Sequence, residues 1–167
     1  TYLGVIGSAT QNFNWFKRRE LDVAPFYAPY LPYTYTAETM PFYNTKSPHT
    51  VLAYWGTLFS YTNKEESSMK FLHTQNITLN LQIEYHMYGG KGLLTREETN
   101  NRTFTLTGNY LGKNYVANGG FISNTIKRNE NGGVKNSKEV LDTILDAKTI
   151  AINLDEASNR IVKKTFF

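Results

Sequence analysis

Two stretches of the chain alternate strictly between two kinds of side chain, and this period of two constrains the fold more than any other feature. Residues 79–88 read Leu-Asn-Leu-Gln-Ile-Glu-Tyr-His-Met-Tyr, and residues 103–110 read Thr-Phe-Thr-Leu-Thr-Gly-Asn-Tyr. Successive side chains of a β-strand point to opposite faces of its sheet. Each stretch therefore predicts a strand with one mainly apolar face and one mainly polar face.

The rest of the chain after residue 50 fits the same class. Less regular strands are predicted at residues 51–61, 69–75 and 115–127, with a sixth beginning near Ile161. Tight turns at 76–78 and 111–114 alternate with longer, charged loops at 61–68, 89–101 and 128–160. We predict an all-β fold in which residues 51–167 form an antiparallel meander, with a short amphipathic helix starting at Ser137 in the longest loop.

The first fifty residues have a different character. They contain all five prolines of the chain, set among aromatic residues, as in residues 25–33 (Pro-Phe-Tyr-Ala-Pro-Tyr-Leu-Pro-Tyr). Proline lacks a backbone donor and fixes φ, so this stretch cannot form central strands. Linkers are poor in aromatic residues. We therefore expect residues 1–50 to be an ordered, irregular segment that packs against a partner surface.

The meander is typical of an outer-membrane β-barrel, which has tight turns at one end and long loops at the other. In such a barrel the polar faces would line the lumen, with Gln82, Glu84, His86, Thr103, Thr105, Thr107 and Asn109. The apolar faces would meet lipid, with Leu81, Ile83, Tyr85, Met87, Phe104, Leu106 and Tyr110. A soluble sandwich would bury the Leu81 face instead, so the alternation alone does not decide. Tyrosines near strand ends and the asymmetry of the loops favour the barrel.

The number of strands limits what this chain can form. Five or six strands are fewer than the ~8 of the smallest single-chain barrels, and open strand edges are not tolerated in hydrocarbon. In a membrane, these 167 residues would belong to something larger, either a longer polypeptide or a barrel completed by other chains. An ending at Phe167, inside an expected strand, favours the longer polypeptide.

The residues with which enzymes and metal sites are usually built are missing. The chain has no cysteine, which excludes disulfides and thiolate ligands. Its histidines, His49, His73 and His86, lack the i, i+4 spacing of a helical metal site, and no Gly-x-Ser-x-Gly occurs. Residues 89–92 (Gly-Gly-Lys-Gly) lack the spacing of a phosphate-binding loop and are predicted to be a loop tip. We expect no catalytic residue, no cofactor and no metal.

The charged residues give little indication of a partner. The acidic pairs at 65–66, 97–98 and 155–156 fall in predicted loops beside basic residues, and we interpret them as solvated charge, with cation binding at a pore mouth as the alternative. Residues 15–19 (Trp-Phe-Lys-Arg-Arg) combine aromatic and basic side chains, as nucleic-acid sites do. The net charge of +4 is, however, spread along the chain. We expect no nucleic-acid partner.

Several segments, in order along the chain, resemble the "putative porin" family of Bacteroidota outer membranes. They are residues 2–9 (YLGVIGSA), 33–50, 73–77 (HTQNI), 100–104 (NNRTF), 126–133 (IKRNENGG) and 146–150 (DAKTI). The resemblance implies an outer-membrane location and a barrel several hundred residues long, of which this chain would be an N-terminal portion. Residues 142–144 also resemble the O-glycan acceptor of that phylum, with Thr143 as the acceptor. Residues 35–39 lack the proline that the family more often shows there.

These observations leave three functional hypotheses. The first is a barrel that passes small polar solutes, surrounded by outer-membrane lipid and by the rest of the barrel or neighbouring proteins, with residues 1–50 as a luminal or periplasmic plug. The second is a non-conducting structural barrel, filled by that segment, in a secretion or surface-assembly complex. The third is a soluble β-sandwich binding module. None of the three is an enzyme.

Overall fold

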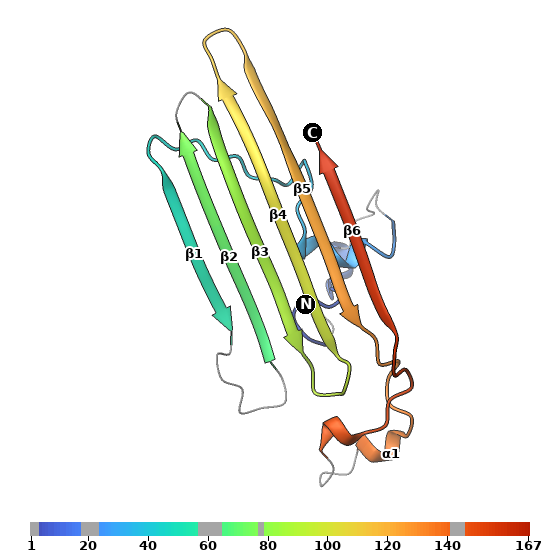
Figure 1. Ribbon diagram of the computed structural model, residues 1–167. Helices are drawn as coiled ribbons and strands as arrows, with labels where there is room; N and C mark the ends of the chain where they lie inside the picture. Colours follow the sequence, from blue (N-terminus) through green and yellow to red (C-terminus); the bar gives the residue numbers. More distant parts are fainter. Residues whose placement is uncertain (1–3, 18–23, 57–64, 77–78, 141–145) are drawn as a thin grey trace.

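The described part of this computed structural model comprises residues 4–17, 24–56, 65–76, 79–140 and 146–167. Its strands form one antiparallel six-stranded sheet in the order β1-β2-β3-β4-β5-β6 (Figure 1). Their bounds are His49–Gly56 (β1), Glu65–Asn76 (β2), Asn80–Lys91 (β3), Glu98–Leu111 (β4), Val116–Asn129 (β5) and Ser158–Phe166 (β6). The prediction of an all-β antiparallel meander is confirmed, and this open sheet is consistent with part of a barrel.

Several strands extend further into the expected loops than the sequence predicted. Gly89 pairs with Asn100, and Lys91 pairs with Glu98, so residues 89–91 and 98–101 belong to strands and the predicted loop tip at 89–92 is wrong. Residues 65–68, 128–129 and 158–160 also lie in strands. The physical reason is that ladder hydrogen bonds join backbone groups, which do not depend on apolar side chains. The charges mark where the apolar stripe ends, and the strands continue beyond it.

Among the described connections, the one between β4 and β5 is short and the one between β5 and β6 is long, as predicted, while residues 57–64 and 77–78 lie outside the described part. At one end of the sheet, the turn end, Gly112 donates its N–H to the carbonyl of Tyr115 (3.0 Å) between β4 and β5. At the other end, the loop end, residues 130–157 contain a β-bridge between Val134 and Ile152 and the short helix α1, Ser137–Val140. This helix begins at the predicted residue; residues 141–145, including Thr143, lie outside the described part. Among described helices, none is long and apolar enough to cross a membrane.

One face of the sheet is covered by the N-terminal segment, meaning the described residues 4–17 and 24–48 (Figure 1). The segment contains two short 3-10 helices, Trp15–Lys17 (η1) and Ala28–Tyr33 (η2). A buried cluster consists of Ile126 of β5 and three tyrosines of this segment, Tyr27, Tyr30 and Tyr33. The main core therefore lies between an irregular segment and a sheet face, which agrees with the expectation that aromatic residues anchor this segment.

We predict that replacing Ile126 with Ala destabilises the protein. Ile126 is 2% exposed beneath the tyrosines, and removing buried methyl groups costs about 2–4 kcal/mol when the cavity cannot collapse. Urea unfolding of the detergent-solubilised protein measures the change in the free energy of unfolding. Leu93→Ala, at a side chain 52% exposed in the 92–97 loop, is the control and should cost less than about 1 kcal/mol. Equal losses in the two variants would contradict the packing described above.

Candidate functional site: the polar face beneath the N-terminal segment

The side chains of the sheet divide into two sets according to the alternation of each strand. The face beneath the N-terminal segment, called here the covered face, carries a row in which Glu84 lies between Leu72 and Thr105. Its buried polar residues come from β2 to β5 and are Thr74, Asn80, Gln82, Glu84, Asn101, Thr103, Thr105, Thr107 and Asn124. The opposite face, called here the uncovered face, carries Leu81, Ile83, Phe104 and Leu106, which are 38–48% exposed.

The two predicted sets of side chains thus lie on opposite faces of the sheet. Among the lumen candidates, Gln82, Glu84, Thr103, Thr105 and Thr107 are buried on the covered face, while His86 and Asn109 are partly buried there. Among the lipid candidates, Leu81, Ile83, Phe104 and Leu106 are exposed on the uncovered face, while Tyr85, Met87 and Tyr110 are partly buried. That the first set lines a lumen and the second meets lipid stays a prediction.

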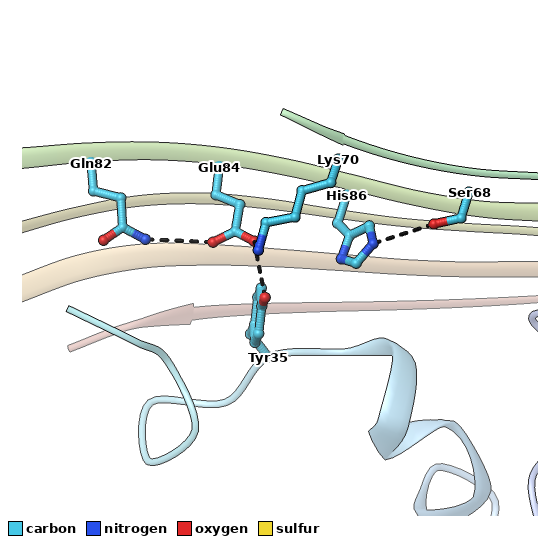
Figure 2. A network of polar contacts seen from close by, with 6 residues as sticks. All are labelled: Tyr35, Ser68, Lys70, Gln82, Glu84 and His86. Carbon is cyan, nitrogen blue, oxygen red and sulfur yellow. Dashed lines mark hydrogen bonds and ion pairs between the residues drawn. The ribbon is translucent and has the colours of Figure 1, made fainter. Parts of the chain in front are cut away.

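The centre of the covered face is a carboxylate that is withdrawn from solvent. Glu84 is 0% exposed. Its Oε1 atom lies 2.9 Å from Nζ of Lys70 and accepts a hydrogen bond of 2.9 Å from the Tyr35 hydroxyl (Figure 2). The Gln82 amide approaches Oε2 at 3.5 Å. A buried carboxylate is tolerated where a cation and hydrogen-bond donors face it, and removing one partner is costly.

Tyr35 reaches Glu84 because Asn124 of β5 holds the backbone of the segment. The Asn124 side chain accepts the Tyr35 N–H at 3.3 Å and donates to the Tyr35 carbonyl at 2.8 Å. Thr103 donates to the same Asn124 oxygen at 3.0 Å, and its hydroxyl also lies 3.2 Å from the Tyr33 carbonyl. The Asn124 amide therefore bonds to both backbone groups of Tyr35, as the backbone of a neighbouring strand would.

The ionisation of Tyr35 follows from this location. Burial, and secondarily the negative charge of Glu84, raise the pKa of the Tyr35 phenol well above its ordinary value. The hydroxyl consequently keeps its proton at neutral pH and remains a donor. Glu84 can then hold both its cation and a neutral donor without competition from a second anion.

The segment is also fixed near both ends of the sheet. At the loop end, Ile6 donates its N–H to Glu66 (3.0 Å), and Asn101 donates to the carbonyl of Gly7 (2.6 Å). Gly7 has φ +87°, and a Cβ there would lie 3.1 Å from the Asn101 amide, so the site requires glycine. At the turn end, Asn80 donates to Asn44 at 3.2 Å. The segment thus spans the covered face along the length of the strands.

Aromatic contacts extend this attachment across the width of the sheet. The Tyr33 and Tyr88 rings meet edge to face with centroids 5.2 Å apart. On the other side, the Arg128 guanidinium lies 5.5 Å from the Tyr30 ring centroid, and the Lys163 ammonium lies 5.1 Å from that of Tyr27. Cations at this distance are attracted to the ring face. The segment is therefore held by β3, β5 and β6 together.

Sequence reasoning identified Glu84 and missed two of the residues that position it. The sequence predicts only an irregular segment around Tyr35, and Gly119-Gly120 interrupts the alternation of the strand predicted at 115–127, which contains Asn124. Glu66, interpreted as a solvated charge, instead binds the backbone of Ile6. The one signal in the sequence is the alternation of the strand, which places Asn124 on the same face as Ile122 and Ile126. In the described residues, no three His, Asp or Glu come close enough to hold a metal ion.

A meander with one covered polar face and one exposed apolar face is consistent with part of a barrel of the outer-membrane type. The family model described as "Putative porin" matches residues 1–167. The chain belongs to this family, which confirms the resemblance and supports an outer-membrane, porin-like protein. A search of the curated proteins and a search of the solved structures gave no significant match.

We predict that the contribution of Tyr35 to stability is lost in alkali. The folded-state pKa lies above the unfolded value of 10.0, so the contribution is complete below pH ~10 and falls as pH rises toward the folded pKa. At pH 8 the wild type should exceed Tyr35→Phe by about 1.5–3 kcal/mol of unfolding free energy, as expected for a hydrogen bond to a charged group. Urea unfolding between pH 8 and 11 measures the difference.

Tyr115→Phe, at a ring 73% exposed near the turn end, serves as the matched control for this pH series. Its unfolding free energy should follow that of the wild type throughout. A difference between wild type and Tyr35→Phe that does not change with pH would show that the hydroxyl of Tyr35 does not donate to Glu84.

Proposed function

We propose that this chain contributes the wall of an outer-membrane barrel through which small polar solutes pass, with the N-terminal segment narrowing the passage. One observation carries the proposal. The N-terminal segment covers the polar face of the sheet, whereas the apolar face is exposed (Figure 1). A soluble sandwich would bury the Leu81 face. The arrangement suits a membrane, in which exposed apolar side chains meet hydrocarbon while polar side chains face an aqueous interior.

The space between the segment and the sheet limits where solutes travel. A gap of about 60 Å³ lies between them, lined by residues including Tyr35, His86 and Thr103. A cavity needs about 10–15 Å³ of such volume to hold one water, so this gap holds a few waters and is too small for larger solutes. The passage therefore runs along the side of the segment that faces away from the sheet, and the segment narrows it.

The nature of the solutes follows from the groups beneath and beside that passage. Glu84 and Lys70 compensate each other, and the other buried side chains around them are mainly hydroxyls and amides. These groups lie beneath the segment and contact no solute in the passage, and because the two charges compensate each other they impose no strong field of one sign on it. We therefore assign small polar solutes, with a weak charge preference.

The charge balance at Glu84 provides the test. Glu84→Gln leaves the Lys70 charge uncompensated, so the permeability ratio of the full-length protein should shift toward anions, on the order of twofold for one charge near the passage. Reversal potentials across a KCl gradient in planar bilayers measure the ratio. Glu98→Gln, the same change on the uncovered face, should leave it unaltered. An unchanged ratio in Glu84→Gln would remove Glu84 from the wall of the passage.

A second function is favoured by the attachment of the segment at both ends and the centre of the covered face. A barrel filled in this way would be non-conducting and would act as a structural subunit of a secretion or surface-assembly complex. Deleting residues 1–48 discriminates between the two functions. Intact porin-like protein should already conduct, and the deletion should increase conductance modestly. A filled barrel should be silent until the segment is removed, and that result would overturn solute passage. Heat-modifiable migration on gels verifies folding of each variant.

A further inference from the structure

A pocket of about 330 Å³ lies at the loop end of the sheet. Its lining includes Tyr54, Ser67, Gly89, Lys91, Asn100 and Lys127. By strand alternation, these side-chain positions belong to the uncovered face. Three other lining residues point to the covered side, since Glu66 and Thr99 bind the backbone of Ile6 and Arg128 lies over Tyr30. The pocket is therefore outside the predicted lumen.

The pocket exists because one row across the sheet has a small residue at its centre. Ser67, Gly89, Asn100 and Lys127 are successive partners in the register of β2 to β5. A Cβ on Gly89 would meet its nearest atom at 3.5 Å, which is ordinary contact, and Gly89 is not among the positive-φ glycines. The backbone thus does not require glycine at this position. Its effect is to leave the floor of the pocket open.

The pocket is bordered mainly by cations. Lys91 and Lys127 line it, and Arg102 and Arg160 lie one position away on the same face, all four exposed. The negative charge on this face of the pocket comes from Glu98, which accepts a hydrogen bond of 3.1 Å from Asn129. Among the described side chains here, positive charge exceeds negative. Basic groups attract phosphates, while carboxylate, amide and hydroxyl groups suit sugar hydroxyls.

The apolar side chains beside the pocket restrict the ligand further. Toward the turn end, the next rows of the uncovered face carry Met69 with Met87, and then Phe71, Tyr85 and Phe104. A ligand with its polar head in the pocket would lay an apolar tail along these residues. In outer-membrane barrels the long loops lie on the extracellular side. The pocket is therefore at the level of the outer-leaflet headgroups.

We infer that this pocket binds the phosphorylated sugar headgroup of an outer-leaflet glycolipid, with the acyl chains lying along the apolar side chains of β2 to β4. Lys91 and Lys127 contact the phosphate, while Ser67, Asn100 and Glu98 contact sugar hydroxyls. The inference rests on the outer-membrane location of the family and is independent of solute passage. A barrel that conducts nothing would bind the glycolipid equally well.

Binding of bis-phosphorylated lipid A to the full-length protein in neutral detergent tests the inference, with native mass spectrometry and fluorescence titration as readouts. The double variant Lys91→Gln/Lys127→Gln should weaken binding roughly tenfold or more, because each cation near a lipid phosphate contributes about 1 kcal/mol. Gly89→Leu, which fills the pocket and keeps every charge, should weaken it comparably. Lys113→Gln/Lys164→Gln removes two exposed lysines elsewhere and should change it less than twofold.

The probe itself is varied to identify the ligand. Lipid A lacking both phosphates should bind the wild type weakly, and inorganic phosphate at the same concentration should not compete. Wild-type affinity in the Lys91→Gln/Lys127→Gln or Gly89→Leu variants would overturn the inference, as would competition by inorganic phosphate, which would indicate an unspecific anion site. Unaltered single-channel conductance in the pocket variants, measured in parallel, separates failure of this inference from failure of solute passage.

Discussion

Much of this structure depends on one requirement, which is that the buried carboxylate of Glu84 must have partners. A charge withdrawn from water needs a cation and donors, and Lys70 and Tyr35 provide them from two different parts of the chain. The dependence is mutual. The segment forms turn hydrogen bonds of its own, but its remaining backbone groups need partners elsewhere, and Asn124 and Asn101 provide some of them. The polar face and the irregular segment therefore stabilise each other.

The two faces of the sheet are the reverse of those in a soluble protein, because the polar face is buried and the apolar face is exposed. In a soluble protein the face with Leu81 and Leu106 would form the core, whereas here the buried face carries threonines, amides and a carboxylate. Burial of these groups is tolerated because most meet a partner across the strands or in the segment, although Thr105 and Thr107 have hydroxyls with no partner among the described residues. Apolar burial on this face consists of the tyrosine cluster over Ile126 together with Leu72 and Ile122.

The sequence predicted the faces of β3 and β4 well, because a period of two is a local property that no distant contact alters. It predicted the strand ends poorly, since the ladder at Gly89 and Lys91 depends on the backbone of the opposite strand. The pairing of Tyr35 with Glu84 joins residues 49 positions apart, and that of Asn124 with Tyr35 spans 89. Such contacts depend on which segment crosses the sheet and where, and this information is absent from any local pattern. The sequence therefore indicated Glu84 as a site residue without indicating what surrounds it.

The path of the N-terminal segment has a consequence for the order of assembly. The segment precedes β1 in the chain and runs along the covered face from Glu66 near the loop end to Asn80 near the turn end. If the sheet closed into a barrel first, these residues would have to be threaded lengthwise through a finished pore, and protein chains avoid such threading. In a closed barrel that holds this segment inside, we therefore expect the segment to take its place while the sheet is still open. Its contacts with Glu66, Asn101 and Asn124 would then form before the barrel closes.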